Sequence, residues 1–468
     1  MNAVPAVHLR TTTLPEISEL RALLGEDALL HKEDEVRPYA GDRASTVEHQ
    51  LPVAVALPRD VAQVQRIARW ATRHRVPLVP RGAGSGLAGG ASALARGVVL
   101  SLERLSAIRE LNAADQYAVA EAGVVNGALG RAAAAQRLFY PPDPGSAEVS
   151  TIGGNVATNA GGLRCVKYGA TADNVLGLEV VLADGRLVHT GGRTLKNVAG
   201  YDLTRLFVGS EGTLGIITAA TLRLRPVPAT APSTFTAGFD SLRAAGAAVA
   251  SIARLPGRPS MLELLDRAAL DAVEAYRPDG VDTSSAALLI GQADGEGAQR
   301  LVAEMVRLCQ EQGATSMTMS SSADGAQEMV SVRRAAGEAL LSSGAATVVE
   351  DVVVPRSRLV EMLGHIERTG REGTVRIATV GHAGDGNLHP VLILPDREPE
   401  TFREAHHKAE RLWRKALDLG GSITGEHGVG TLRRGRLATA LDPAVLDLHR
   451  SVKHAFDPLG ILNPGKAF

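Results

Sequence analysis

Two histidines and a carboxylate toward the carboxyl end of the chain could hold a metal ion, and a third histidine beside them could move a proton. His382 and His389 lie in the sequence GHAGDGNLH, and 37 residues beyond His389 the sequence GEHG brings Glu426 and His427. Imidazole and carboxylate ligands suit zinc, manganese or iron, and three protein ligands leave positions open for a substrate. The pattern therefore indicates a catalytic metal site.

The alternative is that local hydrogen bonds satisfy both histidines. A spacing of seven residues would place them on one face of a helix, but the glycines at 381, 384 and 386 disfavour a helix and favour a loop. Glu426 and His427 would point to opposite faces of a regular strand, so a shared site requires their flanking glycines to bend the backbone.

A glycine-rich loop near the amino end could bind a phosphate. From Val76 the chain reads VPLVPRGAGSGLAGGAS, an apolar strand followed by a turn rich in glycine. Residues without a Cβ atom let backbone N–H groups converge on an anion, and Arg81 would add positive charge. The string fits neither a Walker motif nor a Rossmann fingerprint, so a purely structural turn is the alternative.

Further glycine-rich segments offer polar groups to the same ligand. PPDPGS spans 141–146, STIGGNVATNAGG spans 150–162 and GSEGTLGIIT spans 209–218. Hydroxyl and amide side chains between glycines suit hydrogen bonds to a diphosphate and to the polar edge of a flat ring system. The segments together predict one large ligand.

In this order, the glycine-rich segments resemble FAD-binding oxidoreductases of the vanillyl-alcohol-oxidase type. GHAGDGNLHP, GEHGVG and the terminal GILNPGK resemble the branch with D-lactate dehydrogenases, the glycolate oxidase flavin subunit and D-2-hydroxyglutarate dehydrogenases. The resemblance runs from about Val36 to Phe468. It implies an α+β fold: a two-part FAD-binding domain (1–228), an α/β cap domain for the substrate (229–415), and a C-terminal segment (416–468) that returns to the flavin domain.

The resemblance also implies roles for the residues at the carboxyl end. His382, His389 and Glu426 would hold a divalent metal, and His427 would contact the substrate and act as the catalytic base. Arg333 would bind the substrate carboxylate, because a planar guanidinium suits a planar carboxylate.

Some of these assignments leave alternatives open. Arg334 is adjacent to Arg333, and either residue could instead be a solvated surface arginine. Asn387 would orient the substrate, or its amide would serve a turn locally. Lys466 would face the flavin or have a structural role.

The same resemblance predicts the residues that hold FAD. The loop 81–92 contains neither histidine nor cysteine, which tether the flavin in many relatives, so we expect non-covalent FAD. Cys165 is interpreted as a packed residue rather than a tether. The residues expected to bind FAD are Pro80, Arg81, Gly82, Ala83, Gly84, Ser85, Gly86, Leu87, Asp143, Pro144, Gly145, Ser146, Thr151, Gly154, Asn155, Asn159, Gly161, Glu211, Ile217 and Asn463.

The elements that position these motifs can be outlined from periodicity. Asp60 caps a helix expected over 60–74, which leads into a strand at 76–79 and the first glycine loop. Further strands are expected at 98–102, 117–121, 176–182 and 216–224, and the prolines of 225–232 indicate a linker. The cap domain is predicted as a sheet with helices on one face. Its expected strands are 261–265, 287–291, 347–354, 375–380 and 388–394, and its expected helices are 241–254, 298–312, 326–341 and 357–368.

Composition narrows the class of protein. The 468 residues, 45% of them hydrophobic, are enough for two or three domains. With 50 basic and 51 acidic residues and no dense basic run, nucleic acid is not an expected partner. Two cysteines suggest neither disulfides nor an iron–sulfur cluster, and no segment approaches the ~20 apolar residues of a membrane span. We expect a cytoplasmic protein, and peripheral association at the inner face of the membrane stays open.

The expected reaction is FAD- and metal-dependent oxidation of a D-2-hydroxy acid to the 2-oxo acid, with hydride passing to flavin N5. Glu350 and Asp351 stand near the position where glutarate-type relatives carry a lysine, which favours D-lactate or glycolate. D-2-hydroxyglutarate oxidation, an ether-lipid synthase type of transfer, metal-dependent hydrolysis and non-catalytic flavin binding are the alternatives. Electrons would pass to oxygen or to a separate acceptor, such as a quinone, a cytochrome or an electron-transfer protein. A homodimer or an iron–sulfur partner subunit stays open.

Overall fold

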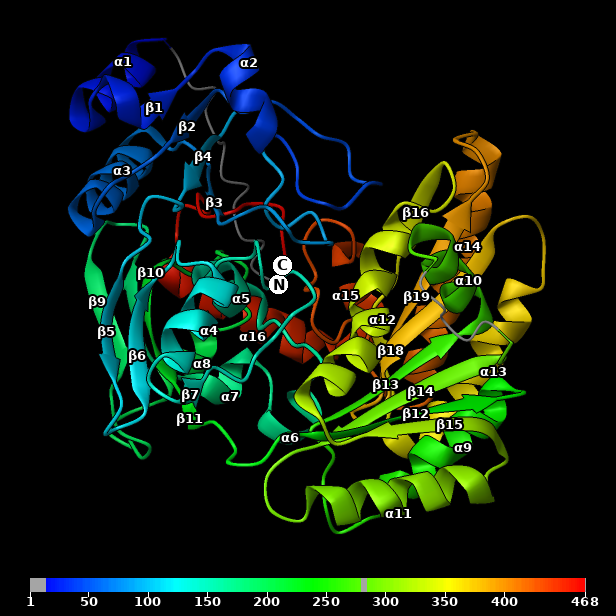
Figure 1. The fold of residues 1–468 in the computed structure, drawn as a ribbon. Helices are drawn as coiled ribbons and strands as arrows, with labels where there is room; N and C mark the ends of the chain where they lie inside the picture. The colour runs from blue at the N-terminus through cyan, green and yellow to red at the C-terminus, as the bar shows by residue number, and fades with distance from the viewer. Residues whose placement is uncertain (1–13, 279–283, 468) are drawn as a thin grey trace.

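The computed structural model describes residues 14–278 and 284–467, which form two lobes (Figure 1). In the first lobe a sheet in the order β1-β2-β4-β3 has β2 and β3 parallel to β4. These strands are β1 (Leu29–Leu30), β2 (Ala54–Ala56), β3 (Leu78–Arg81) and β4 (Val98–Ser101). Helices α1 (Leu14–Leu24) and α3 (Val61–His74) share an apolar core with this sheet.

Helix α3 shows how local sequence determines where a helix begins and ends before the first glycine loop. The Asp60 side chain accepts a hydrogen bond from the Gln63 backbone and caps the helix, as predicted. Val64, Ile67 and Trp70 are buried on one face, and Arg75 ends the helix in the left-handed conformation. The chain then enters β3, which delivers the first glycine loop.

A second, antiparallel sheet in this lobe has the order β5-β6-β10-β8-β9. The predicted strands at 117–121, 176–182 and 216–224 are confirmed within one or two residues. The strands are β5 (Ile108–Asn112), β6 (Tyr117–Glu121), β8 (Val175–Val181), β9 (Leu187–Gly191) and β10 (Ile216–Arg223). Around it lie β7 (Leu138–Phe139), β11 (Arg225–Pro226), α4 (Asn126–Ala134), α5 (Ile152–Thr158), α6 (Cys165–Tyr168), α7 (Thr171–Asn174) and α8 (Leu203–Phe207).

The second lobe is built on a large antiparallel sheet in the order β15-β12-β14-β13-β18-β19-β16, with β17 also paired to β19. The strands are β12 (Ser233–Phe239), β13 (Met261–Asp266), β14 (Ala287–Ala293), β15 (Ala314–Ser320), β16 (Ala346–Val349), β17 (Val352–Val353), β18 (Arg376–His382) and β19 (Asn387–Leu394). The strand expected over 347–354 is thus interrupted, and two buried carboxylates, Glu350 and Asp351, occupy the break.

Helices cover both faces of this sheet, so the prediction of one covered face is wrong. Leu262 and Leu264 of β13 pack into a core with α9 (Leu242–Ile252), α11 (Ala298–Glu311), α13 (Leu359–Gly370) and α14 (Pro399–Asp418). Met261 and Leu265 pack into a second core with α10 (Arg267–Tyr276) and α12 (Ala323–Leu341). Because successive side chains of a strand point to opposite faces, an apolar strand of this kind is buried on both sides.

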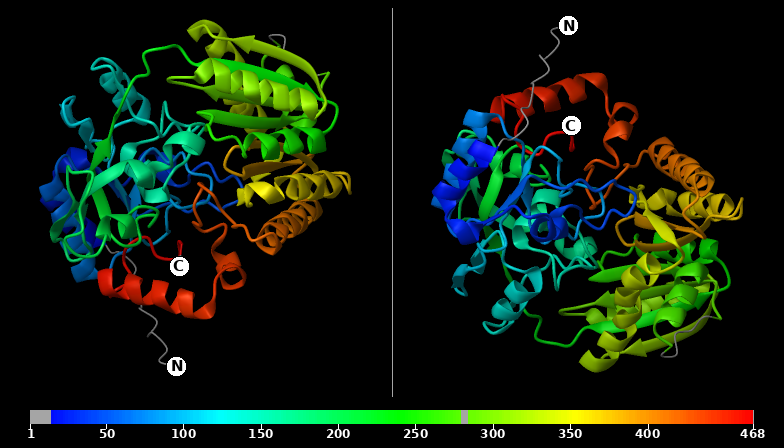
Figure 2. Two further views of the ribbon diagram at one scale, coloured as in Figure 1. Left: turned by 90° about the horizontal axis from the view of Figure 1, so that it is seen from below. Right: turned by 90° about the horizontal axis from the view of Figure 1, so that it is seen from above.

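The carboxyl-terminal segment returns to the first lobe. After α15 (Leu437–Ala440), α16 (Pro443–Phe456) lies along that lobe in both views of Figure 2. Leu462 pairs in parallel with Leu78 of β3, next to the first glycine loop. Among the helices of the described ranges, none is both long and apolar enough to cross a lipid bilayer.

Candidate active site

A cavity of about 800 Å³ separates the glycine loops of the first lobe from the sheet and α12 of the second. Ligand sites in proteins commonly have volumes of about 300 to 1,000 Å³. Residues from 80–91, 140–164 and 211–217 form one side, and residues of α12, β18, β19 and 426–427 form the other. The sequence-predicted flavin and metal segments therefore meet at one cavity.

Nearly all residues predicted to hold FAD line this cavity, but Asn159 and Asn463 do not. The Asn159 side chain accepts a hydrogen bond from the Ala172 backbone, and the Asn463 amide donates to the carbonyls of Gly90 and Glu211. Both asparagines have positive φ angles of 52° and 43° and sit at bends of the chain. Their side chains hold loops in place, and contact of either residue with FAD stays a prediction.

Two charged residues line the cavity but have their side chains engaged elsewhere. The Arg81 guanidinium is buried and donates to the carbonyls of Gly41 and Ala91, at 2.8 and 3.2 Å. The Glu211 carboxylate accepts from the backbone N–H groups of 429 and 430, at 2.7 and 2.8 Å. The Arg81 guanidinium, which was expected to offer positive charge to a phosphate, therefore holds the glycine loop in place. The Glu211 carboxylate links the first lobe to the carboxyl-terminal segment.

Gly161 allows the glycine-rich segment 150–162 to contact the candidate metal ligand Glu426. A Cβ atom at this position would lie 2.1 Å from Oε2 of Glu426, which is closer than real contacts allow. The absence of a side chain at Gly161 is therefore a condition for the two segments to meet.

His382, His389 and Glu426 converge as the sequence predicts. The two histidines lie on neighbouring strands, at the end of β18 and within β19, rather than in an open loop. Nε2 of each ring is 3.3 Å from Oε1 of Glu426. Tetrahedral ligands about 2.1 Å from a zinc ion lie about 3.4 Å from one another, so these spacings fit a divalent metal.

Two buried carboxylates hold the far sides of the imidazole rings. Glu263 lies 2.9 Å from Nδ1 of His382, and Asp351 lies 3.6 Å from Nδ1 of His389. The contact with Glu263 fixes the ring orientation of His382 and leaves its Nε2 for a metal, whereas Nδ1 of His389 has no hydrogen-bond partner among the described residues. Sequence reasoning missed both partners, although a charged residue inside the apolar strand MLELLD was a signal for Glu263.

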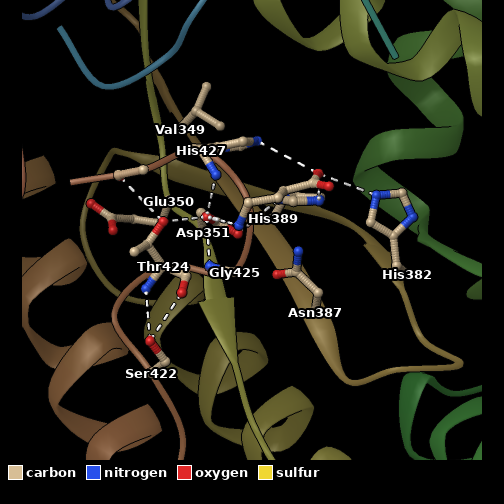
Figure 3. Close-up of polar contacts among 12 residues, drawn as sticks. Val349, Glu350, Asp351, His382, Asn387, His389, Ser422, Thr424, Gly425 and His427 are labelled. Atoms are coloured by element: carbon tan, nitrogen blue, oxygen red, sulfur yellow. Dashed lines mark hydrogen bonds and ion pairs between the residues drawn. The ribbon is translucent and has the colours of Figure 1, made fainter. Parts of the chain in front are cut away.

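Asp351 also shapes the turn that carries Glu426 and His427 (Figure 3). Its Oδ2 atom accepts from the hydroxyl of Thr424 and from three successive backbone N–H groups at 425–427, at 2.7 to 3.0 Å. Burial acts to raise the pKa of Asp351, but His427 and His389 outweigh it and bring the pKa below its ordinary range. The bend that directs Glu426 and His427 to a shared site is therefore fixed by an ionised carboxylate.

The electrostatics of the cluster favour a positive charge where the ligating atoms meet. Burial acts to lower the pKa of His382, yet the carboxylates of Glu263 and Glu426 raise it well above its ordinary value. The same cluster holds the pKa of Glu426 well below its ordinary value, against burial and chiefly through His382. The two carboxylates therefore stabilise positive charge at His382, and a divalent cation would have to replace a proton to bind its Nε2 atom.

His427 stacks on His389, with ring centroids 4.8 Å apart and planes inclined by 16°. Burial lowers the pKa of His427 to about 4, so its imidazole is neutral near pH 7. Nδ1 has no hydrogen-bond partner among the described residues. A neutral imidazole at the cavity wall can accept a proton.

The predicted substrate contacts separate into two groups. Arg333 is buried and lines the cavity, with its Nε donating to Glu263 at 2.7 Å, and the exposed Arg334 also lines the cavity. Asn387 is not part of the lining, because its amide packs behind the site against Gly425. The buried amide oxygen of Asn387 has no hydrogen-bond partner among the described residues, and its role in orienting a ligand stays a prediction.

Three further residues lie outside the cavity lining, and each has structural partners. The buried Glu350 binds Arg436 through two contacts of 2.5 and 2.7 Å, and Asp351 serves the turn described above. Neither acid reaches the cavity, so the argument from their charge to a monocarboxylate substrate loses its physical basis. Lys466 donates to the Ser92 carbonyl, and burial lowers its pKa to about 8.

Fold and site together define a flavin-dependent oxidase scaffold, and the comparisons agree. Residues 52–191 match the FAD binding domain, and residues 230–467 match the C-terminal domain of FAD-linked oxidases. The chain belongs to the FAD-linked oxidase family and carries its FAD-binding domain.

Relatives align over nearly the whole chain. Glycolate oxidase subunit GlcD of Bacillus subtilis (strain 168) is 41% identical over 91% of this chain and 91% of its own length. D-lactate dehydrogenase of Archaeoglobus fulgidus is 34% identical over 92% of this chain and 94% of its own. The probable mitochondrial D-lactate dehydrogenase of Danio rerio is 32% identical over 96% and 91%, respectively.

Solved structures support the fold. Substrate-bound p-cresol methylhydroxylase superposes with a TM-score of 0.81 at 20% identity and covers 97% of both chains. Alkyldihydroxyacetonephosphate synthase superposes with a TM-score of 0.74 at 18% identity, over 99% of this chain and 87% of its own. The predicted vanillyl-alcohol-oxidase-type fold is thereby confirmed.

Proposed function

We propose that this protein catalyses the FAD- and divalent-metal-dependent oxidation of a D-2-hydroxy acid to the 2-oxo acid, with D-lactate or glycolate favoured. The observation that carries the proposal is the convergence of His382, His389, Glu426 and His427 on the cavity that the glycine loops also line. The names of the relatives, glycolate oxidase subunit and D-lactate dehydrogenase, support this class of substrate.

His382, His389 and Glu426 would hold the metal, and two imidazoles with a carboxylate suit zinc, manganese and iron alike. When bound there, a divalent metal supplies Lewis acidity that makes a coordinated hydroxyl easier to deprotonate. The 3.3 Å spacings and the Glu263 carboxylate behind the His382 imidazole support this assignment.

His427 would take the hydroxyl proton of the substrate, and Arg333 would bind the substrate carboxylate. The depressed pKa of His427 keeps the ring neutral, as a base requires. The glycine loops would hold FAD without a covalent bond, and bound FAD would supply a hydride acceptor at N5. Arg333 is buried and His427 is partly buried, and both line the cavity.

The segment boundaries and electron partners are part of the same proposal. Residues 1–228 would form the flavin domain and 229–415 the cap, and 416–468 would complete the site. The return of Leu462 to β3 and the bonds from Glu211 to 429–430 support the last assignment. Electrons would leave to a separate acceptor, and the name of the Bacillus relative, a glycolate oxidase subunit, supports a partner chain.

Steady-state oxidation of D-lactate, L-lactate and glycolate with an artificial electron acceptor tests the proposal. Treatment with a chelator should abolish turnover, and one equivalent of a divalent metal per chain should restore it. Full activity in protein shown to contain no metal would remove the metal from the account.

D-2-hydroxyglutarate is the second candidate substrate, because the adjacent Arg333 and Arg334 of α12 both line the cavity. Each carboxylate of a dicarboxylate substrate could pair with one of these two guanidinium groups. Arg334→Ala should raise the KM for D-2-hydroxyglutarate and leave the KM for glycolate unchanged if this alternative holds.

A further inference from the structure

One buried carboxylate joins the two cationic groups of the site. Glu263 lies in the middle of β13 and is 0% exposed. Its Oε2 accepts from Nε of Arg333 at 2.7 Å, and both its oxygens lie 2.9 Å from Nδ1 of His382. Strand β18 pairs directly with β13, which brings His382 beside it, while Arg333 comes from α12.

Such a carboxylate is costly to bury unless it is fully paired. Here both partners serve the cavity, since Arg333 and His382 line it and Glu263 does not. An imidazole that donates from Nδ1 has a fixed tautomer, with the lone pair of Nε2 available on the opposite side. In His382 that side faces Glu426.

We propose that Glu263 is a positioning residue that fixes the spacing between the metal ligand His382 and the carboxylate-binding Arg333. This inference rests on the proposed function. A 2-hydroxy acid bound at both points would have its hydroxyl near the metal and its carboxylate at the guanidinium. Loss of Glu263 would therefore weaken metal binding and substrate binding together.

Glu263→Gln tests this role with little change of shape. The amide carries no charge, and with its oxygen in the place of Oε2 its NH₂ group would lie where Oε1 contacts Nδ1 of His382, so that one donor would face another. We expect the dissociation constant for Zn²⁺ or Mn²⁺, measured against a chromophoric chelator, to rise about 10- to 100-fold. KM for the 2-hydroxy acid should rise as well, and Glu263→Asp, which keeps two acceptors, should recover part of both losses.

Glu350→Gln is the matched control, because Glu350 is equally buried and also pairs with an arginine, Arg436, away from the cavity. It should lower the melting temperature without changing the metal dissociation constant. Equal loss of metal affinity in both variants, or unchanged affinity and KM in Glu263→Gln, would overturn the role of Glu263. If Glu263→Gln fails to fold, wild-type metal affinity and KM in Glu263→Asp would overturn it.

The metal titration of the wild-type protein distinguishes failure of the metal site from failure of the positioning role of Glu263. A wild-type protein that binds no divalent ion would contradict the metal site itself, and the role of Glu263 with it. Wild-type binding combined with an unaffected Glu263 variant would contradict the positioning role alone.

Discussion

The Oδ2 atom of Asp351 accepts a hydrogen bond of 2.9 Å from the backbone N–H of His427. The same oxygen accepts from the two preceding backbone N–H groups and from the hydroxyl of Thr424. Adjacent residues of a regular strand point in opposite directions, but this turn directs Glu426 and His427 to one cavity. Asp351 thereby links the predicted metal ligand to the predicted base.

Asp351→Asn should weaken the turn and the site together. The amide oxygen can take the place of Oδ2, but it carries no charge, and hydrogen bonds to a charged acceptor are stronger than those to a neutral one. We expect a lower free energy of unfolding in denaturant and at least tenfold slower flavin reduction by substrate. Asp184→Asn, on an exposed turn, is the control; a Asp351→Asn protein that matches it in both measurements would show that the turn does not depend on this carboxylate.

His427→Ala should stop proton removal and spare cofactor binding. Loss of a general base costs about 10² to 10⁴ in rate. The variant should retain FAD and metal at wild-type stoichiometry, and stopped-flow absorbance should show flavin reduction slowed by that factor. His407→Ala, on the exposed side of α14, should behave as wild type. Undiminished flavin reduction in His427→Ala would exclude this residue as the base.

Gly161→Ala should push the glycine-rich segment 150–162 away from Glu426. Because the new Cβ would lie 2.1 Å from Oε2, the carboxylate must move and metal affinity should fall at least tenfold. Metal content after dialysis gives the measurement. Gly435→Ala is the control, since a Cβ there meets nothing within 4 Å. Equal metal retention by the two variants would mean that the segments can separate without disturbing the ligand.

Asp266 should make stability depend on pH. Its carboxylate accepts from the backbone of Ala269 and Thr379, and burial raises its pKa to about 7. An acid whose pKa is raised by folding contributes full stability below its unfolded value near 3.8 and loses that contribution as the pH rises through about 7. Asp266→Asn stays uncharged, so its melting temperature relative to wild type should rise between pH 5 and pH 8. A difference that is constant over this range would contradict the raised pKa.

Local patterns in the sequence predicted the elements that carry the site. The Asp60 cap, the strand at 117–121 and the strands around His389 depend on nearby residues, and all are present. The convergence of His382, His389 and Glu426 also follows from motifs with distinctive residue types.

Pairings between distant residues could not be predicted in the same way. Glu263 lies 119 positions before His382, and no local pattern connects them. Arg81 and Glu211 have the charge that a ligand site would need, but backbone groups from other segments take up that charge. Strands β12 and β15 and helices α10, α14 and α16 were also missed, because their boundaries depend on packing in the second lobe and at the carboxyl end.

Anaerobic reduction of the bound flavin tests the central claim most directly. Purified, metal-replete protein should show a flavin absorption band that D-lactate or glycolate bleaches and L-lactate does not. Bleaching by D-2-hydroxyglutarate alone would favour the second candidate substrate. A flavin band that none of these acids bleaches, with the metal bound, would contradict the account.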